Sequence, residues 1–137
     1  MIHLRHFGYL IRHKLFVFVA GVRLGVPIWR LLIHDWSKFT PTEWNPYSRR
    51  HSGFPIGEEM ARAIAHHHRW NPHHWEHWNG RQMPPHFARE MVADWVGAER
   101  ANHGSWEIRS WYVERQHAMT MHPTTRALVE SLLGKTD

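Results

Sequence analysis

The sequence predicts a single all-α domain of six or seven helices. Its 137 residues suffice for one hydrophobic core, not comfortably for two. Nine tryptophans and a hydrophobic share of 42% indicate a folded globule rather than a disordered chain. Apolar residues recur at helical spacing, and no alternating strand pattern runs longer than four residues. Because no repeat or linker interrupts the pattern, we expect residues 1–137 to form one domain.

The first two helices are expected at about 2–22 and 28–38. The first segment contains no proline, and its apolar residues have the 3.6-residue period of a helix. These residues are Phe7, Leu10, Ile11, Leu15, Phe18 and Val22. Gly25 and Pro27 then break the pattern before the second helix begins.

The segment TPTE contains the start signal of a third helix. We expect Thr40 as its N-cap and Pro41 at its first helical position. Glu43 stands where a capping box places an acidic residue that reaches back to the N-cap. This helix is expected to end near Ser52.

Proline and glycine define the remaining helices. A fourth helix is expected at about 57–69, because Asn71-Pro72 follows it. A polar, aromatic loop leads to a fifth helix at about 85–102. One or two more helices complete the chain, the last at about 123–134.

The composition narrows the classes of function. The chain has no cysteine, which excludes disulfides, thiolate zinc sites and cysteine nucleophiles. A metal would therefore be held by His, Asp, Glu or water, in a site suited to Fe, Mn, Co, Ni, Mg or Zn. The formal charge of +5 favours an anionic partner such as a nucleotide, a nucleic acid or another phosphoester.

The most apolar run, at 15–33, is interrupted by Arg23, Pro27 and Arg30. A membrane span needs about twenty apolar residues with few charges. We therefore expect no membrane partner and a cytoplasmic location. A homo-oligomer is compatible with the sequence.

Histidine is concentrated in the middle of the chain. Six of the twelve residues from His66 to His77 are histidine. His66 and His67 are neighbours on the fourth helix and point about 100° apart. Such a pair can serve two metal ions, or one ion and its surroundings, whereas a surface cluster without function is the alternative.

Two aspartates stand in apolar surroundings, where an unpaired charge is costly. Asp35 follows His34 at the end of an apolar segment, and Asp94 lies beside the apolar face of the fifth helix. Either a core arginine or a metal ion would satisfy Asp94. His13, within the first helix, is either a hydrogen-bonded core histidine or a further ligand.

These pieces, in this order on successive helices, resemble the HD-domain superfamily of metal-dependent phosphohydrolases. HDWSK at 34–38 is similar to the His-Asp-x-x-Lys motif of its two-metal HD-GYP branch. HHHRWN at 66–71 and MPPHFAREMVADW at 83–95 are similar to two further motifs of that branch. The segments HDWSKFTPTEW, HHHRWNPHHWEHW and EMVADW also resemble a small family of HD-like phage and bacterial proteins. The resemblance covers residues from about 13 to 100.

The resemblance implies a dinuclear metal centre. His13, His34, Asp35 and Asp94 would hold one ion, and His66 and His67 a second, with Asp35 bridging. A hydroxide between the ions would attack a nucleotide or related phosphoester.

Other residues have expected roles around the metals. Lys38 would contact a phosphate oxygen or the leaving group, or it is a solvated lysine at a helix end. Glu43 would assist catalysis, as the resemblance implies, unless it only caps its helix.

We interpret the loop after the fourth helix as a lid or substrate wall. His73 or His74 would contact phosphate, and Trp70, Trp75 or Trp78 would stack on a base. The alternative is that the tryptophans fill the core and the histidines hydrogen-bond to the metal ligands.

The sequence departs from the HD-GYP pattern at several positions. His68 stands in place of a glutamate, Asn71 in place of an aspartate, and the Gly-Tyr-Pro element is missing. The resemblance therefore does not carry cyclic dinucleotide hydrolysis to this chain. Some members have one more histidine ligand after the His-Asp pair, and His51 is the histidine available.

Two other functions stay open at this point. The same ligands would serve an HD-type mixed-valence di-iron oxygenase, which activates oxygen instead of water. A basic, tryptophan-rich helical protein could also be a non-catalytic nucleic-acid-binding module. Such a module would not need Asp35 and Asp94 in apolar surroundings.

Overall fold

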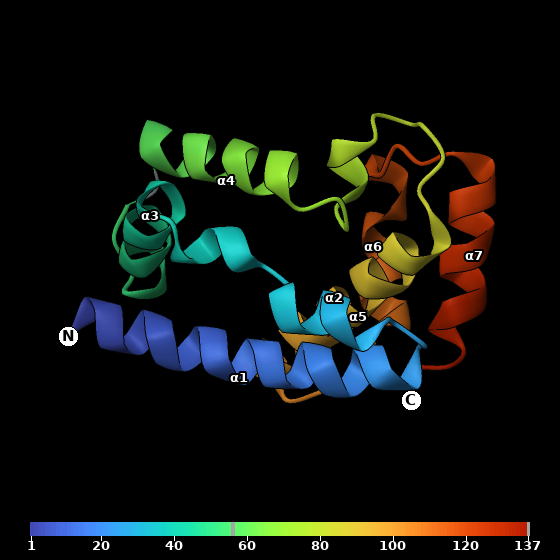
Figure 1. The fold of residues 1–137 in the computed structure, drawn as a ribbon, viewed down its shortest axis with the longest axis horizontal. Coiled ribbons are helices and arrows are strands. Elements are labelled where there is room, and N and C mark those ends of the chain that lie inside the picture. Colours follow the sequence, from blue (N-terminus) through green and yellow to red (C-terminus); the bar gives the residue numbers. More distant parts are fainter. Residues whose placement is uncertain (56, 137) are drawn as a thin grey trace.

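A computed structural model describes residues 1–55 and 57–136. Within them the chain forms seven α-helices and three short 3₁₀-helices, with no β-strand (Figure 1), which confirms the all-α class. In chain order the elements are α1 (Ile2–Arg23), α2 (Ile28–Ile33), η1 (Trp36–Phe39), α3 (Pro41–His51), α4 (Glu58–Trp70), η2 (Trp75–His77), α5 (Pro85–His103), α6 (Arg109–Arg115), η3 (Gln116–Ala118) and α7 (Pro123–Leu133).

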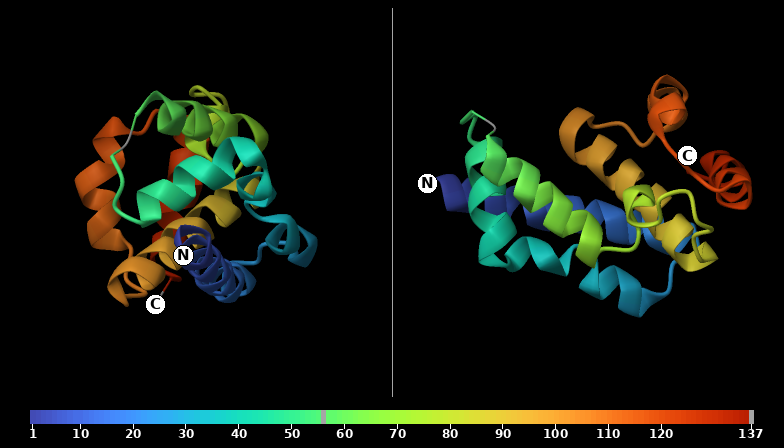
Figure 2. Two further views of the ribbon diagram at one scale, coloured as in Figure 1. Left: turned by 90° about the vertical axis from the view of Figure 1, so that its left-hand side faces the viewer. Right: turned by 90° about the horizontal axis from the view of Figure 1, so that it is seen from above.

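The two longest helices, α1 and α5, pack against each other and form the centre of the molecule. Gly97 makes the close approach between them possible, because a Cβ atom there would lie 2.5 Å from Val17 Cγ2 and 2.8 Å from Val17 N. Helix α7 packs against α5. Helix α3 contacts α1 near its N-terminus and packs against α4 (Figures 1 and 2). The His-rich loop after α4 returns the chain to α5.

Proline and glycine locate most helix ends as the sequence predicts, but the second helix is shorter than expected. Helix α2 ends at Ile33, and a 3₁₀ turn begins only at Trp36. The helix stops because His34 leaves the helical conformation with ψ 129°, and Asp35 then adopts a left-handed backbone conformation with φ 56° and ψ 28°. Aspartate tolerates this conformation better than most residues. The resulting turn directs the His34 and Asp35 side chains into the protein.

The expected capping box is wrong. Thr40 precedes α3 as predicted, but its hydroxyl donates to the carbonyl of Ser37 and does not cap the helix. Glu43 does not reach back to Thr40, because its carboxylate is fully buried and accepts hydrogen bonds from two histidines of α4.

The stripe of apolar residues that predicted α1 is not the stripe that faces the core. Phe7, Ile11, Leu15 and Val22 are exposed. The buried residues of α1 are His6, Leu10, His13, Val17, Ala20 and Gly21. Among the described residues, no helix is long and apolar enough to span a membrane.

Candidate metal centre

Five segments bring histidine and aspartate side chains to one buried point. Helix α1 contributes His13, and the left-handed turn after α2 contributes His34 and Asp35. Helix α5 contributes Asp94 from the face beside its buried apolar residues. Helix α4 and the loop after it contribute three histidines: His67, His73 and His74.

The first ligand group consists of His13, His34, Asp35 and Asp94, whose ligand atoms all lie within 4.8 Å of one another. Asp94 Oδ1 lies 2.9 Å from His13 Nε2 and 3.2 Å from His34 Nε2. The Asp35 carboxylate lies slightly farther from these nitrogens. Its Oδ2 is 3.8 Å from His13 Nε2, and its Oδ1 is 3.6 Å from His34 Nε2. The sequence predicted this set of four residues as neighbours.

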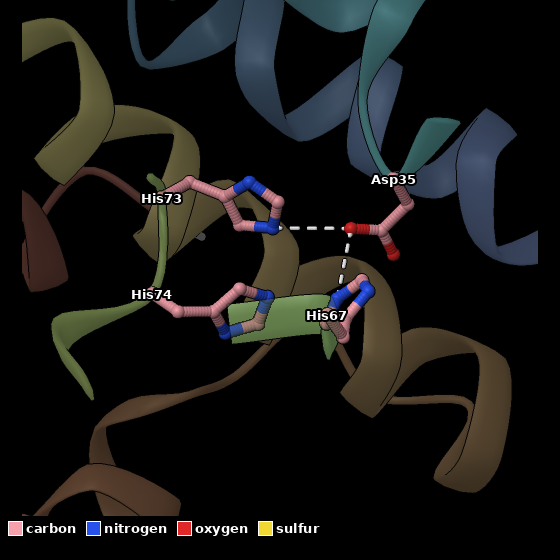
Figure 3. A group of neighbouring side chains, drawn as sticks. All are labelled: Asp35, His67, His73 and His74. Atoms are coloured by element: carbon pink, nitrogen blue, oxygen red, sulfur yellow. Dashed lines mark ion pairs between the residues drawn. The ribbon is translucent and has the colours of Figure 1, made fainter. Parts of the chain in front are cut away.

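The second ligand group consists of Asp35, His67, His73 and His74 (Figure 3). Asp35 Oδ1 lies 3.3 Å from His67 Nε2 and 3.1 Å from His73 Nε2, as the dashed lines in Figure 3 show. The His74 ring lies beside both histidine rings, with centroid distances of 4.7 Å to His67 and 4.2 Å to His73. Asp35 therefore belongs to both groups.

Two buried carboxylates orient the histidines from behind. Glu90 Oε1 lies 3.0 Å from His34 Nδ1 and 3.2 Å from His73 Nδ1, and Arg30 donates two hydrogen bonds to the same carboxylate. Glu43 Oε2 lies 2.8 Å from His67 Nδ1. Because a carboxylate accepts hydrogen bonds, the contacts at His34 and His67 place a proton on Nδ1 and direct Nε2 toward the site.

Several buried atoms at the centre contact an oppositely charged group without an aligned hydrogen bond to it. Within the described part of the chain, neither oxygen of Asp35 nor either ring nitrogen of His13 and His73 has an aligned hydrogen-bond partner. Buried polar atoms are normally paired, so these orphaned donors and acceptors require an explanation. A divalent cation held by imidazole nitrogens and carboxylate oxygens would satisfy them, and the residues present fit such an ion.

The charges of the centre hold several pKa values far from their ordinary range. Burial raises the pKa of Asp35, but the charges of His34 and Lys38 outweigh this effect and hold it well below the usual value. Burial lowers the pKa of His73, yet its contacts with Asp35, Asp94 and Glu90 raise it well above the usual value. Burial and Asp35 raise the pKa of Asp94, but contacts with His13 and His34 hold it well below the usual value. Both aspartates are therefore charged at neutral pH, as metal ligands must be, whereas His73 must lose a proton to bind a metal ion.

A family model matches residues 2–135, that of a family of unknown function (DUF5662). The chain belongs to this family. No curated protein and no solved structure matches it. Because the match covers nearly the whole chain, the ligand groups lie within the family domain.

The structure places some of the expected site residues differently. His66, expected as a metal ligand, belongs to neither ligand group, because its Nδ1 lies 2.6 Å from Glu43 Oε1. His73, expected against substrate, is fully buried among the ligands. His51 lies outside both groups and contacts His6, with 2.8 Å between their Nδ1 atoms. Trp70 is exposed on α4 and its ring contacts the edge of Trp36.

Lys38 lies at the centre rather than at its surface. Its Nζ is 2.5 Å from Asp35 Oδ2, and its side chain is only 13% exposed. Burial lowers the pKa of this lysine, but the charges of Asp35 and Asp94 raise it above its ordinary value. Lys38 is therefore a fixed positive charge beside the shared carboxylate.

Sequence reasoning missed Glu90 and the ligand position of His73. Glu90 lies in the run AREMVADW, one helical turn before Asp94, so a second acidic residue on the same buried face was the available signal. For His73 no local signal existed, because the loop that carries it has no periodic pattern. Two further sets of side chains within the described residues could also hold an ion: His34, His73 and Glu90, and His68, His74 and Glu76. His77 Nδ1 bonds the carbonyl of His68.

A cleft of about 350 Å³ gives access to the centre. It is lined by His74, Glu76, Asp94, Trp95, Trp111 and Arg115, among others, so it reaches both ligand groups. The Arg115 guanidinium lies 5.1 Å from the centre of the Trp111 ring. A larger hollow of about 390 Å³ between α3 and α4 contains none of the ligand residues. The smaller cleft is therefore the relevant one for chemistry.

Proposed function

We propose that this protein is a metal-dependent phosphohydrolase with a two-ion centre, acting on a nucleotide or a related small phosphoester in the cytoplasm. The observation that carries the proposal is the shared carboxylate: Asp35 belongs to two groups of His and Asp ligands. A carboxylate shared by two sites can hold two cations a short distance apart. The HD-like order of the motifs in the sequence supports the same assignment.

The metal would supply a hydroxide at neutral pH and would neutralise charge on the phosphoryl oxygens. Asp35 would bridge, His13, His34 and Asp94 would hold one cation, and His67, His73 and His74 the other. Glu90 and Glu43 hold the histidine rings in the orientation that frees Nε2. Lys38 adds a positive charge beside Asp35, where it would attract a phosphoryl oxygen.

The cleft supports a small organic phosphoester as substrate. Its volume of about 350 Å³ is at the lower end of the range for ligand pockets, roughly 300–1,000 Å³. A phosphoryl group near Asp94 would place the rest of the molecule against Trp95 and Trp111. Indole rings stack on nucleobases, and Arg115 at the rim can pair with an anionic or carbonyl group.

The test is a hydrolysis screen with the untagged protein. Mono-, tri- and cyclic nucleotides are incubated with Mn, Co, Mg or Fe, and phosphate release is measured. The Asp35→Asn variant removes the shared charge, and asparagine tolerates the left-handed backbone of this position. Glu58→Gln is the control, because Glu58 on α4 is an exposed acid outside both the ligand groups and the cleft.

We expect release of phosphate from at least one nucleotide and a loss of about a hundredfold or more in Asp35→Asn. The control should keep the wild-type rate. Two bound irons with a redox-active spectrum and no hydrolysis would replace the proposal with the di-iron oxygenase. Nucleic-acid affinity that survives Asp35→Asn, with no hydrolysis at all, would favour the binding module.

A further inference from the structure

The outer surface of α1 and α2 carries an extended set of exposed apolar side chains. We call it the α1–α2 face. Its members are Leu4, Phe7, Ile11, Leu15 and Val22 from α1, and Ile28, Trp29, Leu32 and Ile33 from α2. Their exposed fractions range from 43% to 75%. Contiguous exposed apolar surface of this kind marks an interaction site more often than scattered single residues do.

The two helices pack against each other. Helix α2 lies beside the C-terminal half of α1 in Figure 1, and the Lys14 ammonium on α1 donates to the carbonyl of Leu32 on α2 at 2.6 Å. Leu31 packs closely against Gly21, which fixes the spacing of the helices. On α1 the face lies opposite the buried side that carries His13. The face is therefore rigid and is presented on the outside of the metal centre.

Exposed arginines border this face. Residues 1–40 contain six lysines or arginines and one acidic residue, Asp35, but Arg30 is paired with Glu90 in the interior and Lys38 with Asp35 in the ligand cluster. Asp35 is buried in the metal centre. Arg5, Arg12 and Arg23 are exposed and lie along one edge of the apolar stripe of α1. The surface is thus apolar in its middle, cationic at its rim and without an exposed acid.

We propose that the α1–α2 face binds the surface of an anionic phospholipid membrane. A helix with an apolar face that includes Phe and Leu, bordered by arginine, lies in the plane of a membrane interface. Each basic residue near an anionic leaflet adds to the attraction. Such binding needs no membrane-spanning helix, and the proposal does not rest on phosphohydrolase activity.

Charge argues against a second copy of the chain as the occupant. Two copies that met through this face would bring two arginine rims together, and residues 1–40 offer no exposed acid to pair with them. Like charges at an interface are unfavourable. An anionic surface complements both features of the face, its apolar middle and its basic rim.

The test is cosedimentation of the full chain with lipid vesicles. One set contains phosphatidylcholine alone, and the other contains phosphatidylcholine with phosphatidylglycerol. We expect binding to the anionic vesicles, weakened by salt, and little binding to the neutral ones. Leu15→Glu and Leu32→Glu should each weaken binding to anionic vesicles about tenfold or more.

Val113→Glu is the matched control. Val113 on α6 is 53% exposed, so the same new charge is placed on an apolar side chain outside the face. This variant should bind vesicles with no more than about a twofold loss. Circular dichroism of all three variants confirms that they fold.

Three results would overturn the proposal. Equal binding to both kinds of vesicle would exclude recognition of anionic lipid. Equal weakening by Val113→Glu would show that the place of the charge does not matter. Absence of vesicle binding, together with a dimer that Leu32→Glu dissociates, would assign the face to contact between copies.

Discussion

At the scale of single residues, the candidate centre depends on Glu90, which contacts both of the ligand groups that share Asp35. Glu90 is fully buried and contacts His34, His73 and Arg30 together. Burial raises its pKa, but contacts with the two histidines and Arg30 hold the pKa well below the usual value. One permanently charged group thus fixes a ligand from each group.

Replacing Glu90 by glutamine should weaken metal binding. The side chain keeps its size but loses the charge that holds two Nδ1 protons, and loss of such a partner costs about 10- to 100-fold in metal affinity. The melting temperature should also fall, because Arg30 loses its buried ionic partner. Competition with a chelator measures the affinity. Glu99→Gln on the same helix, whose partner is the exposed His103, should leave it unchanged.

The sequence predicted the ligands that stand out chemically and missed those that only the fold brings in. His34, Asp35 and Asp94 are recognisable because charged or polar groups interrupt apolar segments. His66 and His67 were equivalent in the sequence, and only the direction of α4 turns His67 inward and His66 toward Glu43. Adjacent helical residues point about 100° apart, so only one of the two side chains can face the ligand groups. The sequence alone does not show which of the two it is.

At the scale of elements, the packing of α1 against α5 sets the geometry of the centre. His13 lies on α1, while Glu90 and Asp94 lie on α5. The sequence located these helices through proline and glycine, but it did not show which face of α1 is buried. Exposed apolar residues outnumber buried ones along α1, so the apolar pattern alone pointed to the wrong face.

Gly97→Ala should destabilise the protein and disturb the centre. The new methyl group would overlap the Val17 backbone, so α1 and α5 must separate, at a cost of about 1–3 kcal/mol. Chemical denaturation measures the loss. The matched control is Gly8→Ala, because a Cβ atom there has open space and alanine favours the helix by about 0.5–1 kcal/mol. Equal stability of the two variants would contradict the close contact between α1 and α5.

At the scale of the whole molecule, stability should depend on pH through the contact between α1 and α3. His6 Nδ1 and His51 Nδ1 lie 2.8 Å apart, so at least one ring must be neutral. Burial lowers the pKa of both residues to about 4, helped at His6 by Lys38 and His3 and at His51 by His6, Lys38, Arg50 and His13. Both histidines are neutral in the folded protein and take up protons when it unfolds in mild acid.

A histidine whose pKa is lowered by folding stabilises the protein fully above its unfolded pKa of about 6.5. That stabilisation is lost as the pH falls from about 6.5 toward 4. Folding raises the pKa values of His34, His67 and His73, so these residues change stability with pH in the opposite direction. The effect of the His6–His51 pair is therefore measured by comparing a variant with the wild type. We expect the free energy of unfolding to fall less steeply over this range in His51→Gln than in the wild type. Parallel curves would contradict the role of this pair.

The most direct test of the central claim is the metal content of the purified, untagged protein by elemental analysis. The account predicts two divalent ions per chain after incubation with Mn or Fe and removal of excess metal, one for each ligand group. It also predicts that Asp35→Asn, which alters the residue common to both groups, retains at most one. A wild-type protein that holds no metal under any of these conditions would contradict the account.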